Sequence, residues 1–279
     1  MAILTISREF GSGGRDVGHA VADAMGYEYV DRKKILEDMR AVGKIWEEKA
    51  KHFDENYPEL WERNDWTYRA FVALNQSNFL EHAVKGNAVI MGRGGNFLLK
   101  TFPMVLKVRI KAPMKDRIER VVTRDGINNE TAQYFIEKAD TEMAKAVYLL
   151  YGRHWDDPEE YDMVFDTSAE SLDRIISTVK GGLSERNTHD TEEARNALKL
   201  RALAEKIKAA ILSDPTFVIS MLDVDPKEEG FAQYGFVLKG IVHEQDDIKG
   251  IERIAARMAG EIPVESLLQH RMYSRMRRR

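Results

Sequence analysis

The sequence contains no cysteine. Disulfide bonds, thiolate chemistry and cysteine-based zinc or iron–sulfur sites are therefore excluded. It also has no apolar run approaching the roughly 18 residues that a membrane-spanning helix needs. The first residues, MAILTISREF, lack the basic segment and long apolar stretch of a secretory signal. We therefore expect a cytoplasmic protein.

A strong excess of one charge is also missing. The chain has 42 Lys and Arg residues against 46 Asp and Glu residues, a net charge of −4. This excludes a basic coat over the whole protein, and we expect no nucleic-acid partner. The exception is the tail over 271–279, which is rich in arginine. That tail is either a solvated end or a contact for nucleic acid, anionic lipid or an acidic protein.

Apolar residues make up 43% of the 279 residues, which is enough for a packed core and about two domains. In the first 180 residues, short apolar runs alternate with helical stretches. The pattern predicts a helix that ends at Gly26 and helical structure over 33–85. Strands are predicted at 3–6, 27–30, 88–91, 105–110 and 163–165. This alternation is typical of an α/β fold with a parallel sheet flanked by helices.

The pattern changes near residue 181. Gly181 and Gly182 are followed by SERNTHDTEE, a polar and turn-rich segment, so we predict a first domain over 1–182 and a linker over 183–193. Beyond it, the predicted order is helix, strand, strand, helix, strand. These elements form a small α+β domain over 194–270, followed by the tail over 271–279.

The most informative segment is a glycine-rich turn between the first strand and the first helix. It contains Gly11, Ser12, Gly13, Gly14, Arg15 and Asp16. Backbone amides in such a turn, together with the helix N-terminus, suit a phosphate group. The alternative is a tight strand-to-helix turn without a ligand.

Two named phosphate motifs do not match this turn strictly. A dinucleotide-binding fingerprint fails because Asp16 stands where the last glycine belongs. In a Walker A alignment, Arg8 replaces the first glycine, Gly14 the lysine and Arg15 the hydroxyl residue that ligands magnesium. We expect Arg15 to supply the charge that the lysine otherwise brings.

Three separate stretches resemble the cytidylate kinase-like family. They are ISREFGSGG at 6–14, VIMGRGG at 89–95 and YLLYGRHWDDPEEYDMVFDTS at 148–168. The resemblance spans about residues 1 to 180. It implies a P-loop nucleoside-monophosphate kinase fold, ATP with Mg²⁺ as the donor, and CMP or dCMP as the acceptor.

The resemblance also assigns roles to residues. Residues 11–16 would surround the donor phosphates, with Thr167 near the donor base and the segment over 125–155 as a lid. Asp31, Arg93 and Arg153 would contact the acceptor. The catalytic cations would be Arg15, Arg93, Arg120 and Arg124. The alternatives stay open: Asp31 can simply cap the next helix, and Arg120 and Arg124 can pair with surface acids.

One departure from the family concerns the lid. Asp140 is followed by Thr141, Glu142 and Met143, where the family usually has a basic pair. Because phosphoryl transfer depends on cations placed around the reacting phosphate, their loss lowers activity. The alternative function is a catalytically weak nucleotide-binding sensor.

The C-terminal domain resembles the BON domain. The likeness rests on VLKGIVHEQDDIKGIERIAARMAG at 237–260 and the IPVESLLQ that follows Glu261. It implies a phospholipid or protein partner. The alternative is a structural or dimerisation appendage, and a third function is an interaction protein that uses this domain and the tail.

Overall fold

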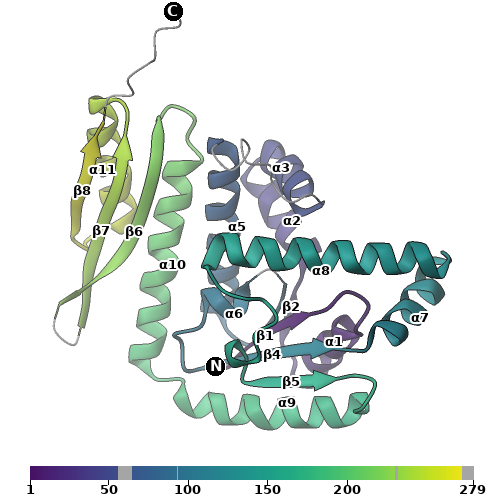
Figure 1. Ribbon diagram of the computed structural model, residues 1–279. Helices are drawn as coiled ribbons and strands as arrows, with labels where there is room; N and C mark the ends of the chain where they lie inside the picture. The colour runs from purple at the N-terminus through teal and green to yellow at the C-terminus, as the bar shows by residue number, and fades with distance from the viewer. Residues whose placement is uncertain (56–64, 93, 230–231, 272–279) are drawn as a thin grey trace, which may run out of the picture. The chain divides into compact units, whose positions relative to one another are not determined.

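The computed structural model describes residues 1–55, 65–92, 94–229 and 232–271. The chain divides into two compact units (Figure 1). Unit 1 comprises Met1–Glu37 and Lys85–Arg195, and unit 2 comprises Asp38–Val84 and Asn196–Arg279. The segment between the second and third strands of unit 1 therefore belongs to the same unit as the C-terminal domain.

Unit 1 is built on a five-stranded parallel sheet with the strand order β2-β3-β1-β4-β5. Its strands are β1 (Ile3–Arg8), β2 (Glu28–Val30), β3 (Ala88–Met91), β4 (Val105–Lys111) and β5 (Met163–Asp166). All five lie at the predicted places. Because β1 lies between β3 and β4, its carboxyl end is at the point where the order of the sheet reverses, which is where open α/β sheets bind ligands.

The core of unit 1 follows from strand alternation. On β1, Leu4 and Ile6 point to the face that is covered by α1 (Gly14–Met25) and α9 (Leu172–Arg186). These residues pack with Val17 and Val21 of α1 in one buried cluster. Helix α6 (Gly95–Leu98) contacts β1 as well. Every strand except β2 and β5 is thus almost fully buried, as expected for a sheet with helices on both faces.

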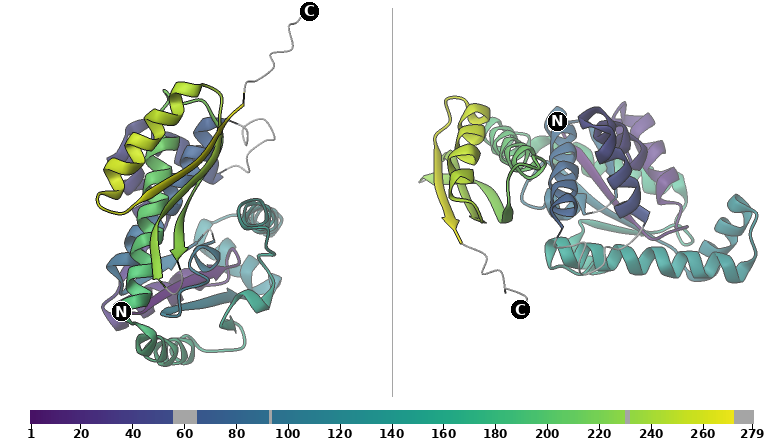
Figure 2. Two further views of the ribbon diagram at one scale, coloured as in Figure 1. Left: turned by 90° about the vertical axis from the view of Figure 1, so that its left-hand side faces the viewer. Right: turned by 90° about the horizontal axis from the view of Figure 1, so that it is seen from above.

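Two helices of unit 1 form a hairpin after β4. They are α7 (Met114–Asp125) and the long α8 (Asn129–Tyr151), as Figure 2 shows. Gly126 ends α7 in the left-handed conformation, and the Asn128 side chain caps α8 by accepting from the amide of Thr131. Val121, Ala132 and Ile136 form the buried core of the hairpin. This hairpin is the segment in which the lid is expected.

The predicted linker over 183–193 is mostly helical, which corrects the expected turn-rich structure. Helix α9 continues through Gly181 and Gly182 to Arg186, and the short 3₁₀ turn η2 (Asn187–His189) follows. Helix α10 (Glu192–Leu212) begins three residues later. Gly182 is held in the helix because it lies against Met163 and Leu106, so packing outweighs the low helix propensity of glycine.

Unit 2 contains the helices inserted after β2 and the C-terminal domain. Its inserted helices are the second half of α2 (Arg32–Val42), α3 (Lys44–Glu55) and α5 (Trp66–Lys85). The C-terminal strands are β6 (Ile219–Glu229), β7 (Ala232–Val242) and β8 (Val264–His270), with α11 (Gln245–Ala259) before β8. β6 and β7 are antiparallel, and β7 and β8 are parallel. Together with α10, this confirms the predicted order of helix, strand, strand, helix, strand.

Within unit 2, helix α10 is buried on two opposite faces. Leu198, Ala202 and Ala209 lie along one face, and Ala204, Ile207 and Ile211 lie along the other. Helix α5 reaches this helix through an ion pair of 2.7 Å between Glu81 and Lys206. Because both faces of α10 are buried, this helix packs against other elements of unit 2 on two sides.

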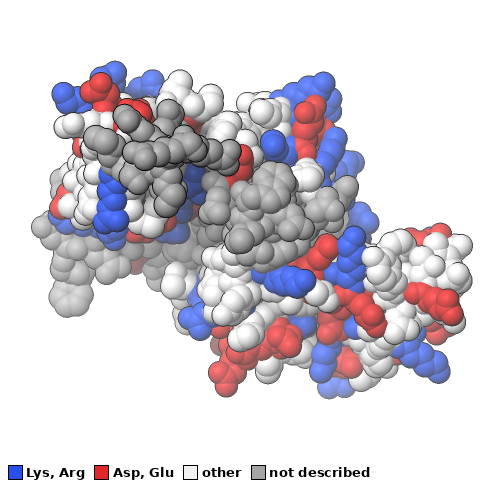
Figure 3. All heavy atoms as spheres, turned by 45° about the horizontal axis from the view of Figure 1, so that its top comes forward, with Lys and Arg blue, Asp and Glu red and all other residues white. Residues whose placement is uncertain are grey.

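No helix in the described part of the chain is long and apolar enough to cross a membrane. Acidic and basic side chains are interspersed on the face that Figure 3 shows, in keeping with the near-neutral charge. Residues 272–279, which hold most of the arginines of the tail, lie outside the described residues.

Candidate active site

The glycine-rich turn joins the carboxyl end of β1 to the N-terminus of α1. Gly11 and Gly13 have φ angles of 79° and 80°, a left-handed conformation that glycine adopts without steric cost. Gly13 is also the N-cap of α1, and no side chain caps this helix. The first amides of a helix have no intrahelical acceptor, so those of Gly14 and Arg15 are directed toward the turn. The left-handed glycines and the uncapped helix N-terminus suit an anion, and phosphate binding at this turn stays a prediction.

Arg120 and Thr167 hold the turn from outside. The Thr167 hydroxyl donates to the carbonyl of Ser12 at 2.7 Å, and Arg120 Nη1 donates to Thr167 Oγ1 at 2.8 Å. Arg120 also lies 3.5 Å from the Gly11 carbonyl. The two residues that were predicted to contact the donor nucleotide therefore meet at the turn, although 47 residues separate them in the chain.

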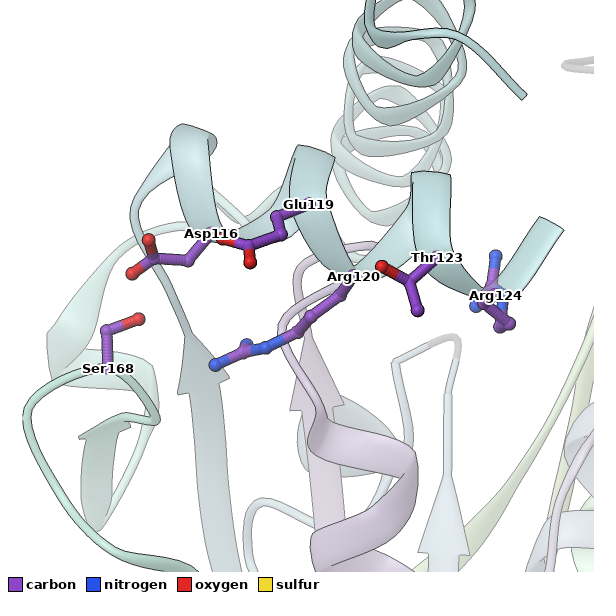
Figure 4. A pocket seen from close by; sticks show the side chains of 6 residues that line it. All are labelled: Asp116, Glu119, Arg120, Thr123, Arg124 and Ser168. Carbon is purple, nitrogen blue, oxygen red and sulfur yellow. The ribbon is translucent and has the colours of Figure 1, made fainter. Parts of the chain in front are cut away.

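A pocket of about 520 Å³ opens beside Arg120 (Figure 4). Its walls are one face of α7 and the segment after β5. Arg120 extends from α7 toward the segment that carries Ser168, as the close view shows. Sequence reasoning named Arg120 and Arg124 here but missed the other lining residues, Asp116, Glu119, Thr123 and Ser168. Helical spacing could have predicted the three that lie on α7, because steps of three and four residues place Asp116, Glu119 and Thr123 on the face that carries Arg120.

The Ser12 side chain is fully buried and donates to the Ile110 carbonyl at 3.3 Å. Its hydroxyl ties the turn to β4, and its backbone amide donates to the Glu9 carbonyl. Ser12 thus takes part in the shape of the turn. Asp16 lies exposed in the first turn of α1.

Asp31 follows β2 and has two partners. Its Oδ1 accepts the amides of Lys33 and Lys34 at 2.9 and 3.2 Å and so caps α2. Its Oδ2 lies 3.8 Å from Nη2 of Arg15, whose side chain is 68% exposed. The capping interpretation and the placement near the turn both hold. Nearby, burial raises the pKa of Tyr29, and the Asp31 charge acts in the same direction.

Arg124 and Arg153 both form ion pairs within unit 1. Arg124 binds the carboxylate of Asp125, which raises the pKa of Arg124, and its guanidinium lies 5.2 Å from the Phe10 ring. Arg153 lies 3.4 Å from the buried carboxylate of Glu160. Arg93 lies outside the described residues, and its predicted contact with the acceptor phosphate stays a prediction.

Next to the turn, ion pairs that the sequence did not predict connect four charged side chains. The side chains of Arg109 and Arg117 are buried, and both approach the carboxylate of Glu9, at 3.5 and 3.7 Å. Arg117 also pairs with Asp140 of α8. Asp140 Oδ1 accepts the amide of Phe10 at 2.9 Å. Glu9 and Phe10, the two residues before the turn, are therefore fixed to β4, α7 and α8 at once.

The segment after α8 is fixed to β1 by Trp155. Its indole Nε1 donates to Ser7 Oγ at 2.7 Å, and Arg109 lies 4.3 Å from its ring. The Tyr161 hydroxyl donates to the Trp155 carbonyl at 2.7 Å, and burial raises the pKa of Tyr161. The contact between Trp155 and Ser7 spans 148 positions of sequence, so no local pattern could have predicted it.

The strand order and the glycine-rich turn at the end of β1 are those of a P-loop kinase fold. A family model, described as "Cytidylate kinase-like family", matches residues 3–169. This chain therefore belongs to the cytidylate kinase-like family. The match ends before α9 and does not extend to the C-terminal domain.

Curated relatives agree with the family. A cytidylate kinase of Pyrococcus horikoshii is 28% identical over 181 residues, which cover 65% of this chain and 88% of that protein. A cytidylate kinase of Methanopyrus kandleri is 29% identical over 190 residues, covering 65% and 92%. Among solved structures, an uncharacterized protein of Eubacterium ventriosum has a TM-score of 0.50 at 21% identity and covers 66% of this chain and 99% of its own. At that identity the likeness shows the fold alone.

Proposed function

We propose that this protein is a nucleoside-monophosphate kinase that transfers the γ-phosphoryl group of ATP to CMP, dCMP or a related acceptor. The observation that carries the proposal is the glycine-rich turn at the end of β1, fixed by Arg120 and Thr167 beside an open pocket. The cytidylate kinases among the relatives support the choice of acceptor.

The donor fits this arrangement. Its phosphates would bind to the turn over residues 11–16, where amides of the helix N-terminus offer partial positive charge. Its base would enter the pocket on α7, with the guanidinium of Arg120 and the Thr167 segment at its edge. Arg15 and Arg124 would bind the phosphates after their ion pairs with Asp31 and Asp125 break.

Mg²⁺ would enter with ATP. The described residues contain no group of three His, Asp or Glu side chains that could hold a metal ion by themselves. In kinases, Mg²⁺ is bound mainly by phosphates and water with one or two carboxylates, which does not require such a group. Bound Mg²⁺ would neutralise charge on the phosphates.

The chemistry needs no general base, because the acceptor phosphate is already an anion. One of its oxygens forms a bond to the γ-phosphorus while the bond from that phosphorus to the β–γ bridging oxygen breaks. ADP leaves with the bond electrons. Asp31, Arg93 and Arg153 would orient the acceptor, and closure of the 125–155 hairpin would exclude water.

A second candidate function is a nucleotide-binding sensor that transfers little phosphate. Three observations favour it. Arg15 has no hydroxyl to offer a metal, and the three positions directly after Asp140 carry no cation. In addition, Arg124 and Arg153 are engaged in ion pairs with Asp125 and Glu160.

For the remaining chain we propose a separate role. The boundaries at 1–182 and 194–270, the BON-like character of the second domain and its phospholipid or protein partner remain proposals. The resemblance of the sequence over 237–269 and the order of helix, strand, strand, helix, strand support them.

The kinase proposal predicts turnover in a coupled ADP-release assay with ATP·Mg²⁺ and CMP, dCMP, UMP, AMP or GMP as acceptors. We expect about 1–10³ per second with the preferred acceptor. Arg93→Ala should raise the acceptor KM, because it removes the predicted phosphate contact. Arg120→Ala should raise the ATP KM, because it removes the support of the turn.

The matched control is Arg174→Ala on α9, whose exposed side chain pairs with Glu170 and lies 3.7 Å from its carboxylate. It should retain the full rate. ATP binding by calorimetry without turnover for any acceptor would refute the kinase and leave the sensor. Neither binding nor turnover would refute both.

A further inference from the structure

The position at which a Walker A loop carries its lysine is sterically closed here. A Cβ placed on Gly14 would lie 2.7 Å from Cβ of Arg8 and 3.2 Å from Cβ of Ile110. Both atoms are attached directly to strand backbone, so neither can move away as the end of a flexible side chain would. Position 14 therefore admits glycine alone while Arg8 is present.

The Arg8 side chain occupies the space that a side chain at position 14 would need. It is the last residue of β1 and pairs with Ile110 of β4 in the sheet register. Its Cδ also lies 3.2 Å from the position of that Cβ, so its stem passes over the N-terminus of α1. A Walker A loop has glycine where Arg8 stands and lysine where Gly14 stands. The two departures are thus complementary, because this chain carries its long cationic side chain at position 8 and its glycine at position 14.

The charge of Arg8 lies near the other groups of the site. Along β1 it shares a face with Leu4 and Ile6, the face covered by α1. The charges of Arg8 and Arg15 both lower the pKa of Tyr29, against the stronger effect of burial. The charges of Arg8 and Arg15 therefore both reach Tyr29 of β2, two residues before Asp31.

We propose that Arg8, in place of the Arg15 expected from the sequence, is the catalytic residue that replaces the P-loop lysine and contacts the β- and γ-phosphates of the donor. This deepens the proposed kinase function and rests on it. A guanidinium stays charged at every physiological pH and can hold two phosphate oxygens at once, so it stabilises the charge that develops on the transferred group.

The test exchanges the two positions. Arg8→Met, which keeps most of the stem and removes the charge, should lower kcat about 10²- to 10³-fold. Gly14→Lys alone should be inactive and less stable, because its Cβ meets Arg8. The double variant Arg8→Gly with Gly14→Lys restores the Walker A order of these two residues. It should recover at least about 10-fold in kcat over Arg8→Gly.

The control Arg174→Met removes an exposed arginine of the same unit and should keep the wild-type kcat. Melting temperatures accompany every variant. The double variant should melt above Gly14→Lys, whatever its activity, because removing Arg8 opens the space for a side chain at position 14.

Two results would overturn the proposal while leaving the kinase intact: wild-type kcat in Arg8→Met, or a folded double variant no faster than Arg8→Gly. Absence of turnover in the wild type would instead refute the proposed function. The melting temperatures would then decide whether positions 8 and 14 exclude one another, and equal values for Gly14→Lys and the double variant would refute that steric argument as well.

Discussion

At the scale of the residue, Asp140 has a role that its sequence context does not suggest. It stands where the family pattern places a lid, yet it accepts the Phe10 amide at 2.9 Å and pairs with Arg117. Arg117 in turn lies 3.4 Å from the Phe10 carbonyl. Both backbone groups of the residue before Gly11 are thus bound by one ion pair. The acid adds no net repulsion to an incoming phosphate, because Arg117 neutralises it.

This contact predicts the effect of Asp140→Asn. The amide keeps an oxygen for Phe10 but loses the charge and turns a donor group toward Arg117. We expect the ATP KM to rise about 10-fold, as for the loss of a hydrogen bond to a charged group. The acceptor KM should stay the same. Steady-state kinetics with each substrate varied in turn measures this.

Glu137→Gln is the control for Asp140, since it removes a carboxylate from the same helix. The Glu137 carboxylate accepts a hydrogen bond from the nearby Gln133 side chain at 2.8 Å. It should behave as the wild type. A parallel rise of both KM values in Asp140→Asn, with a lower melting temperature, would indicate general destabilisation and contradict the assigned role.

At the scale of the element, α9 shows how adjacent glycines differ. A Cβ on Gly181 would have no heavy atom within 4 Å, whereas one on Gly182 would lie 2.7 Å from Met163 Cε and 3.1 Å from Leu106 Cδ2. The first glycine faces open space and the second faces the sheet. The helix tolerates both because Gly182 allows it to approach β4 and β5 closely.

The two alanine variants should therefore change stability in opposite directions. Gly181→Ala should raise the free energy of unfolding by about 0.5–1 kcal/mol, the usual gain inside an exposed helix. Gly182→Ala gains the same backbone contribution but must displace Met163 and Leu106 in a packed core, which costs about 1–3 kcal/mol. Urea unfolding measures both free energies. A Gly182→Ala variant more stable than the wild type would show that Met163 and Leu106 leave room for a Cβ at position 182.

At the scale of the whole molecule, the chain crosses from unit 1 to unit 2 and back before it completes the first sheet. Segment 38–84 leaves after β2 and returns at β3, and it is grouped with the C-terminal domain. Arg69 of α5 donates to the Ser220 carbonyl of β6, and Glu81 pairs with Lys206 of α10. Helix α5 is thus attached to the C-terminal domain, although it stands between β2 and β3 in the chain.

Hydrogen exchange measured by mass spectrometry tests this grouping. Cooperative units open together, so peptides over 65–84 should share the opening free energy of peptides over 196–229 and 236–271. They should differ from peptides over 88–111 and 172–186, which belong to unit 1. The prediction fails if low urea exposes 65–84 together with β3 and β4 while 196–229 stays protected.

Most of the fold could be predicted from local sequence. The strands, the helix that ends at Gly26, and the order of the C-terminal elements follow from apolar runs, periodicity and glycine positions, which act over a few residues. The turn over 11–16 was recognisable for the same reason. The turn-rich structure expected over 183–193 was wrong. Helix α9 continues to Arg186, and the contacts of Gly182 with Leu106 and Met163 that hold it on the sheet have no local signal in the sequence.

The sequence by itself determined the fold class and the glycine-rich turn after the first strand, because short-range sterics and hydrophobic burial decide them. Only the tertiary structure decided which side chains surround that turn. Glu9 meets Arg109 and Arg117, Thr167 meets Ser12, and Arg8 fills the space beside Gly14, although most of these partners lie about 100 residues or more apart in the chain. Such contacts arise from the crossing of strands and helices at one sheet edge, and no local pattern encodes that crossing.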